Sequence, residues 1–375
     1  MSHRPGLTVA IVGCGLIGAK RAHALAPQDR LLACYDLDAE ASARLASRHG
    51  GVACATLEQL LGHNPDVVIV ATVHDQLAAL TEAALKAGAH VLVEKPAGIS
   101  SAQIDALIEC QRAARRQVKV GFNHRFHPGV ARIAEEVHSG HHGELLFVRA
   151  RYGHGGRPGY DREWRAVRER SGGGELIDQG MHLLDLCNWL AGPLPVHSAL
   201  LRTQFWDAQV EDNAALLLGE ARSHSDTWAM LHVSWTEWKN TFSLEVCCLT
   251  AKLQLDGLAG SYGPQRLRIY RMAPQLGPPA LEEIAYPAED RSWRQEWEHF
   301  ADAIAADDHR PLLGDLRCAR NAWLQVEAAY DASGYPSASA AGGGAGAAAG
   351  EAVVRGPAGV SGPGVRRAAI RSFRR

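Results

Sequence analysis

The feature that most constrains this chain is a glycine-rich turn placed directly after its first apolar run. Residues 8–12, Thr-Val-Ala-Ile-Val, predict a short strand buried on both faces, and Gly13-Cys14-Gly15-Leu16-Ile17-Gly18 follows at once, opening a helix-like stretch. The N-terminus of a helix carries unpaired N–H groups and a partial positive charge, which suit a pyrophosphate. In such a turn Gly13 permits the tight bend, Gly15 the close approach of a ligand and Gly18 the helix–strand packing. The turn therefore predicts a dinucleotide site; a tight turn without a ligand is the alternative.

The segments after this turn alternate between strand-like and helix-like composition. Such alternation is typical of right-handed β–α–β units on a parallel sheet. We therefore expect a doubly wound parallel sheet of the Rossmann type in the first third of the chain, with Asp38 and Ser100 placed to cap two of its helices. The expected strands are residues 31–35, 67–71, 90–94 and 118–122, and the expected helices are residues 16–25, 39–49, 77–87 and 100–117.

Asp36, at the end of the second expected strand, bears on the choice of cofactor. A carboxylate there would bind the adenosine ribose hydroxyls of a dinucleotide. The same carboxylate would repel the 2′-phosphate of NADP, and Leu37 follows it where an Arg would neutralise one. We therefore expect NAD, with NADP less favoured.

A second group of residues points to chemistry beyond the dinucleotide. Lys95 follows a parallel strand at the edge where ligands bind in open α/β sheets, although a strand-end lysine pointing to water is the alternative. Residues 175–190 are expected to form one largely buried helix on which Asp178, His182 and Asp185 share a face. A buried imidazole beside a carboxylate fits an acid/base pair, and it equally fits a core histidine hydrogen-bonded to Asp178.

A third segment, residues 151–165, is glycine-rich, basic and aromatic. Tyr160 or Trp164 could stack on a sugar ring, and Arg157, Arg162 or Arg165 could bind a carboxylate or phosphate. A surface loop with solvated charges is the alternative.

Four of these motifs together resemble the glucose–fructose oxidoreductase / inositol dehydrogenase / rhizopine-catabolism (Gfo/Idh/MocA) family of NAD(P)-dependent oxidoreductases. The resemblance extends over residues 8 to about 335. The motifs are residues 12–18, residues 87–96 with Glu94-Lys95-Pro96, residues 120–126 with Asn123-His124-Arg125, and residues 174–185 with Asp178 and His182.

The resemblance implies a Rossmann domain followed by an α/β domain with a large, mostly antiparallel open sheet. It also implies that Lys95, Asp178 and His182 form the catalytic set in the substrate site, and that Asn123 and Arg125 lie near the nicotinamide and the substrate. One departure is the segment Thr72-Val-His74-Asp-Gln-Leu77, where the family often has Thr-Pro-Asn.

On these grounds we expect an NAD(P)-dependent dehydrogenase acting on CH–OH groups of a sugar, sugar acid, cyclitol or nucleotide-sugar. In that reaction His182 would take the proton and Lys95 would bind the reacting oxygen, while Asp178 would orient the imidazole or bind a neighbouring hydroxyl. The alternatives are an NAD-dependent glycoside hydrolase on the same scaffold and a non-catalytic nucleotide-sensing protein. The residues expected to bind the cofactor are Gly13, Gly15, Leu16, Ile17, Gly18, Asp36, Thr72, Glu94 and Lys95. The residues expected to bind the substrate are Lys95, Asn123, Arg125, Tyr160, Trp164, Asp178 and His182.

Composition divides the 375-residue chain unevenly. Residues 337–375 are rich in Gly and Ala and carry six Arg against one acidic residue, so the formal net charge of −2 hides an acidic body. Such a stretch cannot bury enough apolar surface to offset its ordering entropy. We therefore predict a dinucleotide-binding domain over residues 1–121, a substrate-binding and oligomerisation domain over residues 122–336, and a disordered tail over residues 337–375.

Several further expectations follow from what the sequence lacks. No apolar run approaches the length that spans a bilayer, no signal-peptide segment is recognisable at the start, and the eight Cys form no pairing framework, so we expect a cytoplasmic protein with reduced thiols. The histidine-rich segments around His124 and around His141 lack acidic or Cys company, which favours solvated or hydrogen-bonding histidines and no metal. The acidic body argues against nucleic acid as a partner.

The family resemblance, and the prospect of an apolar sheet face, predict a homodimer or homotetramer.

Overall fold

The computed structural model describes residues 4–220, 227–307 and 310–336. The predicted disordered tail, residues 337–375, lies outside the described residues. Within these ranges no helix is both long and apolar enough to cross a lipid bilayer.

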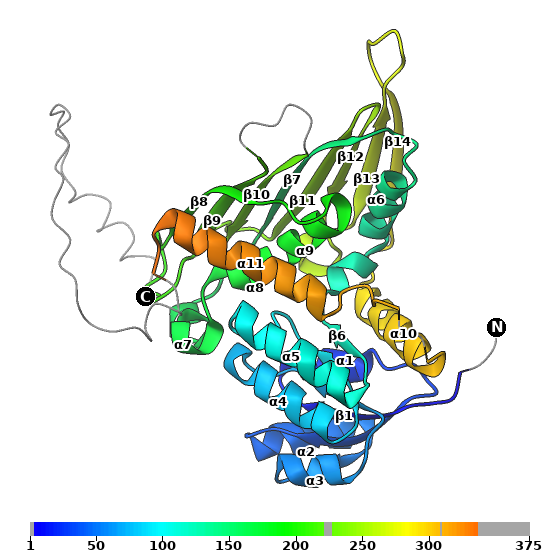
Figure 1. The fold of residues 1–375 in the computed structure, drawn as a ribbon, viewed down its shortest axis with the longest axis vertical. Coiled ribbons are helices and arrows are strands. Elements are labelled where there is room, and N and C mark those ends of the chain that lie inside the picture. The colour runs from blue at the N-terminus through cyan, green and yellow to red at the C-terminus, as the bar shows by residue number, and fades with distance from the viewer. Residues whose placement is uncertain (1–3, 221–226, 308–309, 337–375) are drawn as a thin grey trace, which may run out of the picture.

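The first sheet is the predicted doubly wound parallel sheet (Figure 1). Its six strands lie in the order β3-β2-β1-β4-β5-β6, and all the pairs are parallel. Asp38 and Ser100 accept hydrogen bonds from backbone N–H groups in the first turns of α2 and α5, as predicted. The strands are β1 Thr8–Val12, β2 Arg30–Tyr35, β3 Val52–Ala53, β4 Val67–Val70, β5 His90–Val93 and β6 Val118–Val120, and the helices are α1 Leu16–His23, α2 Ala39–His49, α3 Leu57–Gly62, α4 His74–Lys86 and α5 Ser101–Ala114.

The second sheet has eight strands in the order β14-β13-β12-β11-β7-β10-β9-β8. Six of its seven neighbouring pairs are antiparallel, and β7 with β10 is the parallel exception, so the expected large, mostly antiparallel sheet is confirmed. The strands are β7 Leu145–Gly153, β8 Val196–Arg202, β9 Asn213–Leu218, β10 Trp228–Ser234, β11 Thr241–Cys248, β12 Ala251–Asp256, β13 Arg266–Arg271 and β14 Ala280–Ala285.

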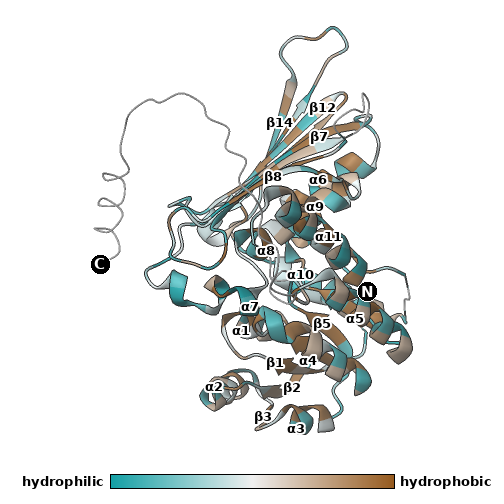
Figure 2. Ribbon diagram, turned by 60° about the vertical axis from the view of Figure 1, so that its left-hand side comes forward, coloured by the Kyte–Doolittle hydropathy of each residue, from teal (hydrophilic) through white to brown (hydrophobic). Residues whose placement is uncertain are grey.

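Helices cover one face of this second sheet. In both views α6 (Pro128–His138), α9 (Gly180–Ala191) and α11 (Leu316–Ser333) lie on the side that faces the first sheet (Figure 1, Figure 2). The strands alternate accordingly: in β10, Ala229 and Leu231 are buried, whereas Trp228 and Met230 on the opposite face are 40% and 49% exposed. We call that opposite side the open face of the sheet.

Helix α10 (Ser292–Ala305) returns the chain from the second sheet to the first. Its Trp297 and Phe300 are buried in one apolar cluster with Val9 and Ile11 of β1. Helix α10 therefore packs on the first sheet although it follows β14 of the second, and the division of the chain at residues 121 and 122 stays a prediction. The remaining short helical segments are α7 Arg168–Ser171, α8 Glu175–Asp178, η1 Asn123–Phe126, η2 Tyr160–Arg162, η3 Trp164–Ala166 and η4 Gly260–Tyr262.

Candidate functional site

The three glycines of the first turn differ in what surrounds them. Gly13 has a φ of +93°, and a Cβ there would stand 2.4 Å from the Ala71 carbonyl oxygen; a Cβ on Gly18 would stand 1.9 Å from the Gly13 carbonyl oxygen. A Cβ on Gly15 would meet no atom within 4 Å. The chain's own packing therefore requires Gly13 and Gly18, whereas Gly15 leaves open space at the N-cap of α1, where a ligand could approach the backbone.

The open space beside Gly15 is bounded by a fixed carboxylate and a groove. Asp36 Oδ2 accepts a hydrogen bond of 2.6 Å from the Cys14 N–H, so the end of β2 is joined to the glycine turn. An open groove of about 880 Å³ lies between α1 and α2, and its lining includes Gly15, Leu16 and Arg44. Thr72, which follows the neighbouring strand β4, is half-buried. These groups surround the space that a dinucleotide would need.

Lys95 and Asp178 are paired although they come from different parts of the fold. The Lys95 Nζ lies 2.7 Å from Asp178 Oδ1 and 2.5 Å from the Asp178 carbonyl oxygen. Arg165 approaches the other carboxylate oxygen, with its Nε 3.3 Å from Oδ2. Burial raises the pKa of Asp178, but Lys95 and Arg165 outweigh it, and the net pKa lies well below the usual range. The carboxylate therefore stays ionised between two cations.

The backbone around Asp178 departs from the predicted single helix over residues 175–190. The structure has two helices, α8 and α9, with a break at Gln179. Because Lys95 Nζ takes the Asp178 carbonyl oxygen, the N–H of His182 donates to the Gln179 carbonyl instead of to Asp178. The prediction of one continuous helix is wrong for this reason.

His182 lies at the start of α9 and is buried. Its ring stacks on that of His124, with centroids 3.8 Å apart and planes inclined by 19°. Burial and the nearby Lys95 ammonium lower the pKa of His182 well below its ordinary value, so the imidazole is neutral near neutral pH and able to accept a proton. Asp178 makes no hydrogen bond to His182 in the described structure, so the interpretation of His182 as a core histidine bonded to that carboxylate is not supported.

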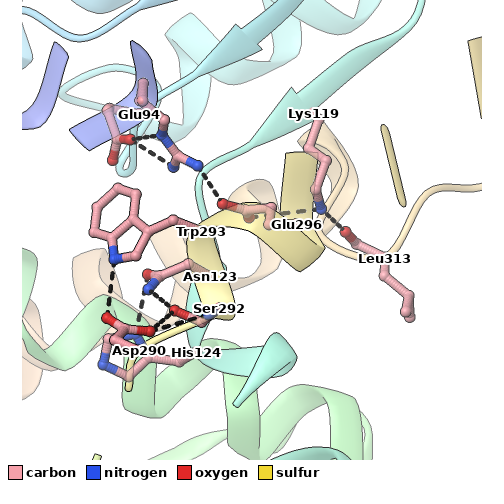
Figure 3. A network of polar contacts seen from close by, with 10 residues as sticks. Glu94, Lys119, Asn123, His124, Asp290, Ser292, Trp293, Glu296 and Leu313 are labelled. Atoms are coloured by element: carbon pink, nitrogen blue, oxygen red, sulfur yellow. Dashed lines mark hydrogen bonds and ion pairs between the residues drawn. The ribbon is translucent and has the colours of Figure 1, made fainter. Parts of the chain in front are cut away.

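Three other predicted site residues have side chains engaged in buried contacts of their own. Asn123 donates through Nδ2 to the hydroxyl of Ser292, at 2.9 Å. Arg125 forms two hydrogen bonds to Asp185, of 2.7 and 2.6 Å. The carboxylate of Glu94 accepts from the buried Arg21, whose guanidinium also contacts Glu296 (Figure 3). Their roles toward cofactor and substrate stay predictions.

The aromatic residues of segment 151–165 differ in their placement. Tyr160 is buried in a cluster with Trp206 and Trp235, so packing within the protein occupies its ring. The Trp164 ring is half-buried, meets the edge of the His74 ring at 4.7 Å, and carries the Arg165 guanidinium 4.5 Å from its centroid. Trp164 therefore lies beside the Lys95–Asp178 pair, whereas Tyr160 lies in a neighbouring apolar layer.

The structure places two histidines in the site that the sequence did not indicate as site residues. His74, at the start of α4, is buried, and burial followed by the charge of Lys95 lowers its pKa to about 3. His124 is buried, with its ring stacked on that of His182. From the sequence we expected a solvated or hydrogen-bonding histidine without a role in the site. The available signal was position: His124 lies within the motif at residues 120–126, and His74 within the segment that departs from the family pattern. In the described ranges no three His, Cys, Asp or Glu side chains are grouped as a metal site would require.

Two family models match the chain. The model described as an oxidoreductase family with an NAD-binding Rossmann fold matches residues 7–122, and the GFO/IDH/MocA C-terminal domain model matches residues 130–254. Together the two matches take in more than half of the chain and include the glycine turn, Lys95, Asp178 and His182.

Several curated relatives are named as dehydrogenases. D-glucoside 3-dehydrogenase of Escherichia coli is 32% identical over 195 residues, which are 50% of this chain and 54% of that protein. Levoglucosan dehydrogenase of Pseudarthrobacter phenanthrenivorans is 26% identical over 234 residues, 58% of this chain and 59% of that protein. The alignments thus span little more than half the length of these relatives.

Solved structures resemble the whole described fold. Levoglucosan dehydrogenase in complex with NADH and levoglucosan superposes with a TM-score of 0.78 at 19% identity, covering 88% of this chain and 97% of that one. GenD2 from gentamicin A biosynthesis, in complex with NAD, superposes with a TM-score of 0.73 at 24% identity, covering 89% and 96%. At these identities the likeness supports the fold.

Proposed function

The chain belongs to the Gfo/Idh/MocA family of oxidoreductases, and on that premise we propose that it transfers a hydride between NAD and a secondary alcohol or ketone of a sugar-like substrate. The observation that carries this proposal is the Lys95–Asp178 pair beside a neutral, buried His182. One cation and one neutral base at the same place are what the removal of an alcohol proton requires.

The glycine turn is the place where the chain would hold the dinucleotide. The space at Gly15 admits a phosphate to the N-terminus of α1, which has no acidic residue in its first turn. Asp36, fixed by the Cys14 N–H, presents a carboxylate suited to ribose hydroxyls and unsuited to a 2′-phosphate, which favours NAD over NADP. When bound, the nicotinamide supplies the acceptor for the hydride that leaves the substrate carbon.

The side chains around the reacting alcohol have separate tasks. Lys95 donates a hydrogen bond to the substrate oxygen and stabilises the negative charge that develops there. His182 takes the hydroxyl proton, while the carbon–hydrogen bond breaks with its electron pair and the carbonyl forms. Asp178 holds the Lys95 ammonium in place through the 2.7 Å contact. In the reduction direction the same groups act in reverse.

The substrate class is inferred from the relatives and from the surroundings of Asp178. The named activities of relatives include a glucoside dehydrogenase and inositol dehydrogenases, which fits a polyhydroxylated ring. Trp164 offers a partly exposed aromatic surface next to Asp178, and Arg165 adds a second cation there. A sugar, cyclitol, sugar acid or nucleotide-sugar meets these demands.

We propose a homodimer or homotetramer that forms through the open face of the second sheet. Trp228 and Met230 of β10 are joined on that face by the exposed Leu217 of β9 and Leu200 of β8. This apolar patch on three neighbouring strands, beside the charged Arg149 of β7, fits a second copy of the chain. The predicted cytoplasmic location stays a prediction.

The test is a substrate screen with purified protein. We would incubate it with NAD or NADP and with neutral sugars, sugar acids, cyclitols and nucleotide-sugars, and follow the absorbance of the reduced nicotinamide. A dehydrogenase accumulates reduced nicotinamide in step with an oxidised product. Release of a free sugar from a glycoside with no net reduction of NAD would support the hydrolase alternative.

A further inference from the structure

The ring of His182 lies against the ring of a second histidine. His124 stacks on it nearly in parallel, and the two imidazoles share a buried position at the meeting of α9 with η1. The rings of Tyr152 from β7 and Phe242 from β11 also meet His124, at centroid distances of 5.1 and 6.2 Å, and Tyr152 borders His182 as well, at 6.2 Å. The His124 ring is therefore in contact with the rings of His182, Tyr152 and Phe242.

His124 is held by a chain of hydrogen bonds that ends at α10 (Figure 3). The Ser292 hydroxyl donates to Asp290 Oδ1 at 2.6 Å, and Asn123 Nδ2 donates to the Ser292 oxygen at 2.9 Å. The Asn123 Oδ1 is then left to accept from His124 Nδ1–H, at 3.2 Å. This direction of donation places the proton of a neutral His124 on Nδ1.

The unsatisfied atoms of the two rings mark the pair as more than packing. His124 Nε2 and His182 Nδ1 are both buried without a hydrogen-bond partner among the described residues. Leaving such atoms unpaired costs stability, so the stack is maintained against a penalty. A structural role alone would be served better by an apolar ring at position 124.

We propose that His124 is a positioning residue for His182: it holds the imidazole flat against a neutral ring that is anchored through Asn123 and Ser292 to the start of α10. This inference rests on the proposed function, in which His182 takes the proton. The flat ring keeps water from that face of His182 and so maintains the burial that lowers the pKa of the imidazole.

The charges around the pair favour one proton at most. His182 is approached by Lys95 from the end of β5, by Asp178 from α8, by Arg21 from α1 and by His127 after η1. Burial, followed by the neighbouring His182, His127 and Lys95, lowers the pKa of His124 well below its ordinary value. Asp178 acts on His182 in the opposite sense to these groups, and it does not offset a second positive charge. His124 therefore stays neutral while His182 takes up and releases its proton.

The experiment measures the pKa of His182 directly by NMR of histidine-labelled protein, without NAD or substrate. We would compare the wild type with His124→Phe, which keeps a flat ring, and with His124→Leu, which keeps bulk without one. His138→Gln, at an exposed histidine bonded to the Trp189 carbonyl, is the matched control. The melting temperature of each variant reports whether it is folded.

We expect the pKa of His182 to stay within about 0.3 units of wild type in His124→Phe and to rise by about one unit or more in His124→Leu, because water then reaches the freed imidazole. An unchanged pKa in a folded His124→Leu variant, or an equal rise in the Phe variant, overturns the proposal. If His124→Leu does not fold, the variant Ser292→Ala is used instead, because it removes the anchoring hydroxyl and leaves both rings. A rise in the pKa of His182 smaller than one unit then supports the proposal, and an unchanged pKa overturns it.

The titration of His182 can be measured whether or not the protein has the proposed dehydrogenase activity. A failure to reduce NAD with any polyol would leave the titration unaffected and would refute only the dehydrogenase activity. If the activity is present, the acid limb of kcat/KM should move with the measured pKa of His182 in His124→Leu. A merely structural role of His124 would lower the melting temperature without moving that limb.

Discussion

The Lys95 ammonium lies 2.7 Å from a carboxylate oxygen of Asp178, across 83 positions of sequence. Lys95 follows the last residues of β5 in the parallel sheet, and Asp178 ends α8 beneath the second sheet. The site therefore exists only where the two sheets meet, and each partner fixes the other. The same lysine also takes the Asp178 carbonyl and so creates the break before α9, which begins two residues before His182.

Replacing Lys95 by Met should remove the hydrogen bond to the reacting oxygen. We expect kcat to fall by about 10²-fold or more, while the dissociation constant of NAD stays within a factor of about three. Steady-state kinetics and a fluorescence titration with NAD measure the two quantities. Lys86→Met, at an exposed lysine paired with Glu82 on α4, is the control and should match wild type. Near-normal turnover in the Lys95 variant would refute the role of this lysine.

The rate of alcohol oxidation should depend on pH through His182. Because burial and Lys95 lower its pKa below 6.5, the imidazole is neutral above that lowered value and becomes protonated only as the pH falls through it. We therefore expect kcat/KM to be flat at neutral pH and to decline with acidity below pH 6.5. His182→Gln should lower the rate by about 10²–10⁴-fold and abolish this decline. A midpoint above pH 6.5, or an unaltered profile in the variant, would be inconsistent with His182 as the base.

The replacement Asp36→Ser should change the choice of cofactor. It removes the carboxylate that accepts from the Cys14 N–H and that would bind the ribose, so we expect the affinity for NAD to fall about tenfold and the ratio of NADP to NAD affinity to rise. Equilibrium titrations with both dinucleotides measure this. Asp38→Ser, which leaves a hydroxyl at the N-cap of α2, should change neither affinity. An unchanged ratio in Asp36→Ser would remove the basis for assigning NAD.

The buried pair of Arg125 and Asp185 should contribute to stability more than an exposed pair. Arg125→Met leaves the Asp185 carboxylate buried without its guanidinium, which costs about 3–5 kcal/mol of the free energy of unfolding. Arg112→Ala removes an exposed contact with Glu109 and should cost less than about 1 kcal/mol. Chemical denaturation of the two variants measures the difference. Equal losses would mean that Arg125 is not held as the structure shows.

The open face of the second sheet should determine the oligomeric state. Placing two carboxylates there with Trp228→Glu and Met230→Glu should yield a species near the chain mass of 40.4 kDa in light scattering, whereas the wild type should run as a multiple of it. A wild type that is monomeric, or a double variant with the wild-type mass, would exclude this face as the interface.

The parts of the fold that the sequence predicts are those whose burial leaves a plain pattern. All four residues of β4, Val67–Val70, are buried and form an unbroken apolar run. Strand β3 has two exposed residues, and the residues of β14 are exposed or half-buried, so neither strand carries such a pattern and neither was expected. Edge strands of this kind are defined by their neighbours' hydrogen bonds rather than by their own side chains.

The sequence indicated which residues form the site better than it indicated the contacts that they make. The motifs led to Lys95, Asp178 and His182, which the fold brings together. The break at Gln179 was not predictable, because the group that takes the Asp178 carbonyl comes from β5, far away in sequence. The stacking of His124 on His182 likewise depends on α10, whose Ser292 lies 169 positions after Asn123. Local sequence patterns carry no information about such long-range partners.

The central claim, that this chain oxidises a sugar-like alcohol with NAD by way of His182, is tested most directly by one paired measurement. Wild type and His182→Gln, at equal occupancy by NAD, would be given the best substrate from the screen, and the initial rate of formation of reduced nicotinamide would be recorded. We expect stoichiometric reduction of NAD by wild type and a rate lower by about 10²-fold or more in the variant. Equal rates in the two proteins, or turnover of the substrate without net reduction of NAD, would contradict the claim.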